Sequence, residues 1–222
     1  MSNQESVDYH HPTEHKRKVT ARYSTEGVQV TMPMPNPKHI NRFLKRNCAL
    51  DLLNPKFHMK WDAKEISESE AMLYAIWTHL EVRPTDENVV AYCVGDGARP
   101  RTGALLAFTT QWKVQSIDPL LSQWNNEYMP VQRLTIIPSR VQDVLQVNNY
   151  ITRQTRIIVA PHSHAPLKDC LHLFKNNAGP NHIVAMPCCQ DLHLHQEPDK
   201  VYYDWACLSP ERLVKVWKDI KV

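Results

Sequence analysis

Hydrophobic residues along this chain gather in short runs that alternate with longer segments of helical periodicity. Five runs have the length and apolar content of buried strands, and they cover residues 89–94, 113–118, 131–137, 156–160 and 182–186. Helical spacing predicts helices over 39–53, 62–80 and 167–176, and a serine–proline start predicts another over 209–217. Strands that alternate with helices predict an α/β fold with a mainly parallel sheet flanked by helices, preceded by an N-terminal helical extension.

The first strand runs into Gly95-Asp96-Gly97, where two glycines permit a sharp turn and a close backbone approach to a ligand. Apolar residues resume at Ala104, and Thr102 is the predicted N-cap of the helix that begins there. A strand, a glycine turn and a helix form the opening of a nucleotide-binding α/β unit. The spacing is not GxGxxG and no GKS or GKT follows, which disfavours a dinucleotide site and excludes a P-loop.

The second strand ends in Asp118, about 20 residues after the turn. A carboxylate at the tip of this strand can accept hydrogen bonds from both ribose hydroxyls of a nucleoside. The alternative is an ordinary strand–helix–strand unit in which Gly-Asp-Gly is only a tight turn.

Together these residues resemble the first two motifs of the Rossmann-like S-adenosylmethionine (SAM) methyltransferases, an acidic glycine-rich turn and a second strand that ends in an acid. The resemblance implies a Rossmann-like sheet with SAM as the cofactor. It implies that Gly95 and Gly97 let the backbone approach the methionine moiety. It also implies that Asp96 contacts the ammonium group and that Asp118 holds the ribose.

Polar residues follow the later strands as well. Arg140 and Asp143 follow the third strand, where the resemblance implies a loop that lines the adenine. His162 and His164 follow the fourth strand, where it implies residues that face the methyl acceptor. A histidine there can act as a base near neutral pH or orient the attacking atom. The alternative is that one histidine caps the next helix and the other is buried and hydrogen-bonded.

After the fifth strand, Pro187-Cys188-Cys189 is similar to an element of a methyltransferase subset that includes tRNA 2′-O-methyltransferases and related uncharacterised proteins. This similarity favours RNA over protein as the methyl acceptor. The chain departs from the subset in its His-Ser-His motif and in the absence of a preceding zinc-finger cluster, so the acceptor stays open.

Zinc binding is an alternative use of the C-terminal cysteines and histidines, because thiolate and imidazole are preferred zinc ligands. The candidate ligands are Cys188, Cys189, His193, His195 and Cys207. Adjacent cysteines rarely both ligate one ion, and no CxxC is present. We therefore expect no bound metal.

At 222 residues the chain can bury one good core, and the predicted division is a disordered basic tail over 1–23, a helical extension over 24–84 and a SAM-binding domain over 85–222. No signal peptide opens the chain and no run is long enough to span a membrane. The six cysteines are then expected as reduced thiols, which predicts an intracellular protein, cytoplasmic or nuclear.

Three functions follow from these patterns. The favoured one is a SAM-dependent methyltransferase. The alternatives are a non-catalytic Rossmann-like binding or regulatory module and a zinc-stabilised RNA-binding protein that uses its basic tail. The formal charge of +3 neither requires nor opposes a nucleic-acid partner.

Overall fold

The computed structural model describes residues 18–22, 29–33, 36–54, 61–123, 131–144, 150–187 and 194–222. The chain divides into two compact units, Met1–Pro35 and Asn36–Val222. In the first unit, β1 (Lys18–Arg22) pairs antiparallel with β2 (Gln29–Pro33). Strand β1 lies inside the segment that was expected to be disordered. Both strands carry β-branched residues, which favour extended pairing.

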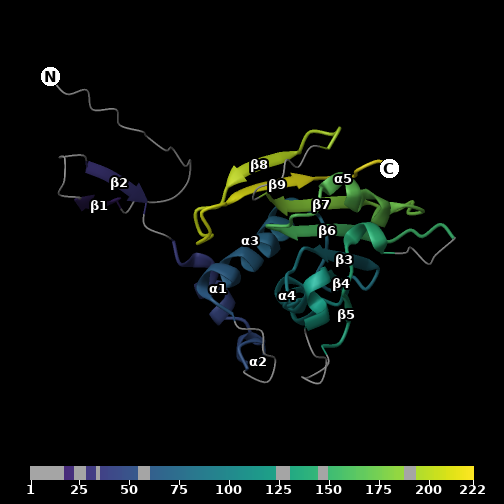
Figure 1. Ribbon diagram of the computed structural model, residues 1–222, viewed down its shortest axis with the longest axis horizontal. Coiled ribbons are helices and arrows are strands. Elements are labelled where there is room, and N and C mark those ends of the chain that lie inside the picture. Colours follow the sequence, from purple (N-terminus) through teal and green to yellow (C-terminus); the bar gives the residue numbers. More distant parts are fainter. Residues whose placement is uncertain are drawn as a thin grey trace. The chain divides into compact units, whose positions relative to one another are not determined.

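The second unit contains a seven-stranded sheet with the order β5-β4-β3-β6-β7-β9-β8 (Figure 1). Its strands are β3 (Val89–Val94), β4 (Lys113–Ile117), β5 (Leu134–Ile137), β6 (Thr155–Pro161), β7 (Asn181–Met186), β8 (Lys200–Tyr203) and β9 (Leu213–Trp217). The first five are parallel, and β9 is antiparallel to both of its neighbours. Strand β8 therefore runs in the same direction as the first five. The five strands predicted from the sequence are confirmed, and the sheet is Rossmann-like and mainly parallel.

The predicted helix over 209–217 is wrong, because residues Leu213–Trp217 form β9. Val214 and Val216 alternate with Leu213 and Lys215, which is the pattern of a strand, although Ser209-Pro210 before them is typical of a helix start. Val214, Val216 and Trp217 are buried between two neighbouring strands. Burial on the sheet decided between two local patterns that the sequence alone did not separate.

The helices are α1 (Lys38–Leu44), α2 (Ala49–Leu52), α3 (Ala63–His79), α4 (Arg101–Thr109) and α5 (Leu167–Cys170), with 3-10 helices η2 (Pro119–Gln123), η3 (Val141–Asp143) and η4 (Leu171–Phe174). The helix predicted over 39–53 is divided into α1 and α2. Helix α3 is confirmed and begins in a capping box, in which Asp62 accepts a hydrogen bond from the Glu65 amide at 2.8 Å.

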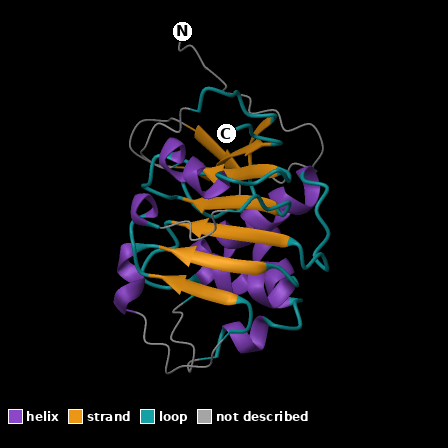
Figure 2. Ribbon diagram, turned by 90° about the vertical axis from the view of Figure 1, so that its right-hand side faces the viewer, coloured by secondary structure: helices purple, strands orange, loops and turns teal. Residues whose placement is uncertain are grey.

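Side chains alternate between the two faces of the sheet, and both faces are buried. Val89, Ala91 and Cys93 of β3 join the core formed with α1 to α4. Val90 and Tyr92 join the core formed with α5 and η4. Figure 2 shows helices on both sides of the sheet. This layering leaves the strand ends as the places where polar side chains can gather.

Among the helices of the described residues, none has both the length and the apolar character needed to cross a bilayer.

Candidate cofactor and acceptor site

The strand order reverses between β3 and β6, because β4 and β5 lie on one side of β3 and β6 and β7 on the other. In open α/β sheets, ligands bind beyond the carboxyl ends of the strands at such a switch point. Gly95 follows β3 directly, His162 follows β6 and Asp118 follows β4. The candidate site is therefore built from residues that the sequence analysis selected.

The glycine turn is held against the end of β4. Both glycines are left-handed, with φ of 75° at Gly95 and 73° at Gly97. The Gly97 amide donates to Asp118 Oδ2 at 3.0 Å, and the Leu120 amide donates to Asp118 Oδ1 at 2.8 Å. The structure thus brings Asp118 and the turn together, as neighbouring strand ends predict. Each carboxylate oxygen has a second lone pair, so Asp118 can still accept hydrogen bonds from a ligand.

The two glycines face different surroundings. A Cβ at Gly95 would lie 2.6 Å from Ser163 Oγ and 2.8 Å from Ser163 Cα, so the loops after β3 and β6 are in close contact there. A Cβ at Gly97 would meet nothing within 4 Å. Gly95 therefore serves packing at the switch point, and open space lies beside Gly97.

Asp96 has a structural role in this geometry. The side chain is 7% exposed, and its carboxylate accepts the Thr102 amide at 3.0 Å, the Gly103 amide at 2.9 Å and the Ser116 hydroxyl at 2.5 Å. Burial raises the pKa of Asp96, although these hydrogen bonds oppose the rise. Asp96 thus caps the start of α4, in place of the predicted cap Thr102, and its contact with an ammonium group stays a prediction.

His162, predicted from the sequence to face the methyl acceptor, is paired with a residue that the sequence analysis missed. His162 Nε2 lies 3.1 Å from Glu68 Oε1 of α3, and both side chains are largely buried. Lys64 Nζ lies 2.8 Å from the same oxygen. Burial would raise the pKa of Glu68, but His162 and Lys64 outweigh it and the pKa is lowered. Glu68 is therefore a carboxylate that holds an imidazole, as in acid–base sites.

His162 also has a left-handed backbone, with φ of 53°, which is uncommon for a residue other than glycine. Such conformations persist where the surroundings enforce them and are concentrated at functional sites. A weak sequence signal for Glu68 existed: it stands four residues before the buried Met72, on the same side of a helix.

The other predicted residues lie near the same edge but are more open. His164 is exposed in the loop after β6, and Arg140 and Asp143 are exposed in the loop after β5. Gln142 Nε2 of η3 donates to Asp169 Oδ2 of α5 at 3.1 Å, which links the segments that follow β5 and β6. The structure shows no ligand role for any of them, and those roles stay predictions.

Of the proposed zinc ligands, Cys188, Cys189 and His193 lie outside the described residues. His195 is exposed. Cys207 is fully buried beside Ser67 and Met186, and burial raises its thiol pKa to about 11. A thiol that stays protonated is a poor zinc ligand. No group of three metal-binding side chains occurs within the part of the chain that the structure describes.

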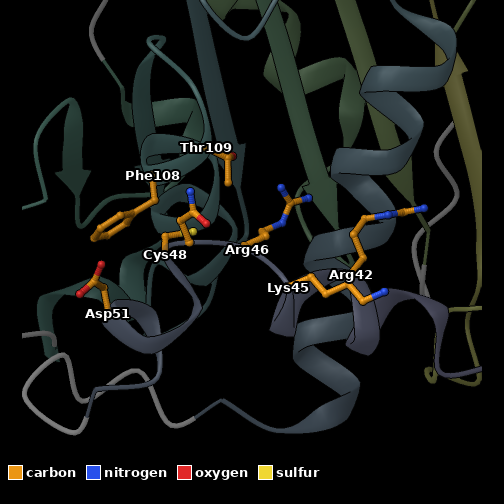
Figure 3. Close-up of a pocket in the computed structure, with 8 residues that line it drawn as sticks. Arg42, Lys45, Arg46, Cys48, Asp51, Phe108 and Thr109 are labelled. Atoms are coloured by element: carbon orange, nitrogen blue, oxygen red, sulfur yellow. The ribbon is translucent and has the colours of Figure 1, made fainter.

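An open pocket of about 650 Å³ lies away from this site, lined by α1, α2 and the end of α4 (Figure 3). Phe108 and Thr109 form its wall at the far end of α4, with Thr109 about 12 Å along the helix from Arg101. Arg42, Lys45 and Arg46 make its lining basic. This pocket is not the crevice beside the glycine turn.

No protein-family model matches the chain, and no curated protein matches it. A mutant of MtNAS in complex with S-adenosylmethionine aligns with 82% of this chain and 70% of its own, at 14% identity and a TM-score of 0.48. Magnesium protoporphyrin IX methyltransferase from Synechocystis PCC 6803 with bound SAM aligns with 82% of this chain and 96% of its own, at 11% identity and a TM-score of 0.45.

A candidate methyltransferase from an antibiotic biosynthesis pathway of Anabaena variabilis aligns with 52% of this chain, at 12% identity and a TM-score of 0.36. The chain spans only 44% of that protein. Likenesses at this level do not assign an activity. The fold assignment rests on the strand order of this chain.

Proposed function

We propose that this protein is a SAM-dependent methyltransferase. The observation that carries the proposal is the contact between the left-handed Gly97 and Asp118 at the switch point of the sheet. This contact places a carboxylate beside Gly97, which has open space next to its backbone, at two adjacent strand ends. A nucleoside with an attached amino acid needs both: an acceptor for its ribose hydroxyls and room beside the backbone.

The sheet order supports a methyltransferase over a dinucleotide-dependent enzyme. A dinucleotide-binding sheet has six parallel strands in the order 3-2-1-4-5-6. Here the antiparallel β9 lies between β7 and β8. The glycine spacing also departs from the dinucleotide pattern.

The residues that would hold the cofactor are Gly97 and Asp118, with Asp143 as a further candidate for the adenine. When bound, SAM supplies an electrophilic methyl group and leaves as S-adenosylhomocysteine. Asp118 would accept hydrogen bonds from the ribose. Asp96 would keep the turn in shape by fixing the start of α4, through the Thr102 and Gly103 amides.

On the acceptor side, we assign the role of base to His162. An acceptor hydroxyl or amine loses a proton when it gains a methyl group, and an imidazole can take that proton near neutral pH. Glu68, 3.1 Å from His162 Nε2, would orient the ring and stabilise the imidazolium that results. His164, exposed in the same loop, is assigned to contact with the acceptor.

The test is calorimetric titration of SAM and S-adenosylhomocysteine into the wild type, Asp118→Ala and Asp118→Asn. Two charge-assisted hydrogen bonds contribute roughly 1.5–3 kcal/mol each, so Asp118→Ala should weaken SAM binding at least about tenfold. Asp118→Asn keeps an oxygen that can accept a backbone amide and should fold more stably than Asp118→Ala. Glu81→Gln is the control, because Glu81 is exposed in the loop before β3, at the opposite edge of the sheet.

A melting curve for each variant separates lost binding from lost folding, since Asp118 also accepts two backbone amides. Failure of the wild type to bind either nucleoside at millimolar concentration would reject the methyltransferase and favour the non-catalytic module. Equal binding by a folded Asp118→Ala would reject the ribose assignment alone.

A further inference from the structure

Cationic and aromatic side chains gather where α1 meets the end of β8. His39 Nε2 of α1 lies 2.8 Å from Asp204 Oδ2, and both side chains are buried. Asp204 follows β8, and the Asn36 amide donates to the Trp205 carbonyl. Figure 1 shows the segment between β8 and β9 beside α1. These contacts fix two surface elements next to each other.

The α1 side of this region is basic. Arg42 lies over the Tyr74 ring with its guanidinium carbon 4.7 Å from the centroid, and Lys38 Nζ lies 5.8 Å from the same centroid. Lys45 is exposed after the helix. A pocket of about 480 Å³ is lined by Lys38, Arg42 and Lys45, and it shares the last two with the pocket in Figure 3. A basic groove therefore follows α1.

The β8 side is aromatic. The rings of Tyr203 and Trp205 are stacked, with centroids 6.0 Å apart and an angle of 29° between their planes. The Arg212 guanidinium carbon lies 5.3 Å from the Trp205 centroid. Tyr203 is 56% exposed and is therefore accessible to a ligand. An exposed stacked ring beside an arginine is a platform on which a base can stack.

The acids of this region do not cancel its charge. Asp204 is paired with His39, and the buried Glu70 is paired with Arg46 through both carboxylate oxygens. Two further acids of the described residues belong to this region. Asp51 lines the pocket in Figure 3, and Glu211 precedes Arg212 in the sequence. We define Lys38, Arg42, Lys45, Tyr203, Trp205 and Arg212 as the α1–β8 surface. Its four cations, Lys38, Arg42, Lys45 and Arg212, outnumber Asp51 and Glu211.

We propose that the α1–β8 surface binds single-stranded RNA, with phosphates on the α1 cations and bases on the Tyr203 and Trp205 rings. Aromatic platforms beside a basic groove are the features that bind single strands without base-specific hydrogen bonds. The surface lies at the carboxyl edge of the sheet, because β8 is parallel to β3 and β6. A strand held there extends toward His162 along the same edge. The interpretation of the bound RNA as the methyl acceptor rests on the proposed function.

Fluorescence anisotropy of a labelled, unstructured 12-nucleotide RNA tests the proposal with the full chain. Lys38→Gln/Lys45→Gln should weaken binding at least fivefold and reduce the slope of log affinity against log salt by about 1.4. Tyr203→Ala should weaken binding at least about fivefold without changing that slope. Every variant keeps residues 1–35, so any binding by the basic tail is common to all.

Matched controls carry the same chemical changes elsewhere. Lys113→Gln/Lys175→Gln removes two exposed charges, at the start of β4 and after η4. Tyr150→Ala removes a ring that is 65% exposed. Both controls should bind RNA like the wild type. Equal losses in variants and controls would overturn the proposal, and so would tighter binding of a duplex of the same sequence.

Competitors separate the sources of binding. Inorganic phosphate at the same concentration of phosphate groups, or polyglutamate at equal charge, should displace the RNA far less than unlabelled RNA does. Equal displacement of the labelled RNA by phosphate would indicate an ion site, and equal displacement by polyglutamate would indicate an acidic-peptide site. Either result would reject the inference. Titration of SAM into the same samples distinguishes the two proposals. SAM binding without RNA binding would reject only the proposal that the α1–β8 surface binds RNA. Absence of SAM binding would reject the proposed methyltransferase function.

Discussion

At the scale of single residues, Gly95 and Gly97 share a left-handed backbone but differ in their neighbours. Alanine at Gly97 adds only the conformational cost of a left-handed residue, about 1–2 kcal/mol. Alanine at Gly95 adds this cost and a clash with the Ser163 backbone, for a total of about 3 kcal/mol or more. Urea unfolding of both variants measures the difference. Equal losses would mean that the β6 loop moves aside, contrary to the tight packing described above.

His162 and Glu68 form the second prediction at this scale. If His162 takes a proton from the acceptor, His162→Ala should lower turnover by about 10²–10⁴-fold while SAM affinity changes less than about threefold. Glu68→Gln should lower turnover by a smaller factor and shift its pH profile, because it alters the partner of the imidazole. Transfer of a radiolabelled methyl group to total RNA is the measurement.

The matched variant is Glu65→Gln, one turn before Glu68 on α3, whose carboxylate lies 2.9 Å from Arg101 rather than from a histidine. Its pH profile should stay that of the wild type. A shared shift in both variants would point to a general effect of α3 on the site.

At the scale of elements, the His39–Asp204 pair joins α1 to the end of β8. Burial would raise the pKa of Asp204, but the contact with His39 outweighs it and the pKa falls below 3.8. A carboxyl group with a lowered pKa binds fewer protons when folded, so its stabilisation is present above pH 3.8 and is lost as the pH falls through the folded value. The free energy of unfolding should therefore decrease with acidification below about pH 5.

Asp204→Asn should remove about 1.5–3 kcal/mol of stability near pH 7 and flatten this acid limb. Chemical unfolding at several pH values provides the check, with the exposed Glu87→Gln as the control. If the free energy of unfolding of Asp204→Asn falls with acidification as steeply as that of the wild type, other carboxyl groups cause the acid sensitivity.

The same scale shows what the sequence could and could not predict. Most of the parallel strands were predictable because they are buried apolar runs, as Val89–Val94 illustrates. Strand β9 was missed because its five residues fit helical spacing too, and only pairing with β7 and β8 decides. The turn and Asp118 could be predicted from local sequence. Glu68 could not be paired with His162, because that contact joins residues 94 positions apart through the packing of α3 on the sheet.

At the scale of the whole molecule, the chain separates into Met1–Pro35 and Asn36–Val222. The sheet, its helices and the candidate site all belong to the second unit. We expect a protein that begins at Asn36 to fold, to melt within about 3 °C of the full chain and to bind SAM within a few-fold of its affinity. Differential scanning calorimetry and SAM titration check this. A collapse of either quantity would show that the first unit supports the second.

Strand β8 precedes β9 in the chain but lies outside it in the sheet. During synthesis β8 is therefore made before β9, the strand with which it pairs in this sheet. Before Leu213–Trp217 is made, the edge of β7 that faces away from β6 has unpaired backbone groups, and β8 has no partner strand. Exposed edges of this kind invite pairing between chains. Insertion of β9 therefore covers the outer edge of β7 and gives β8 its place in the sheet in the same step.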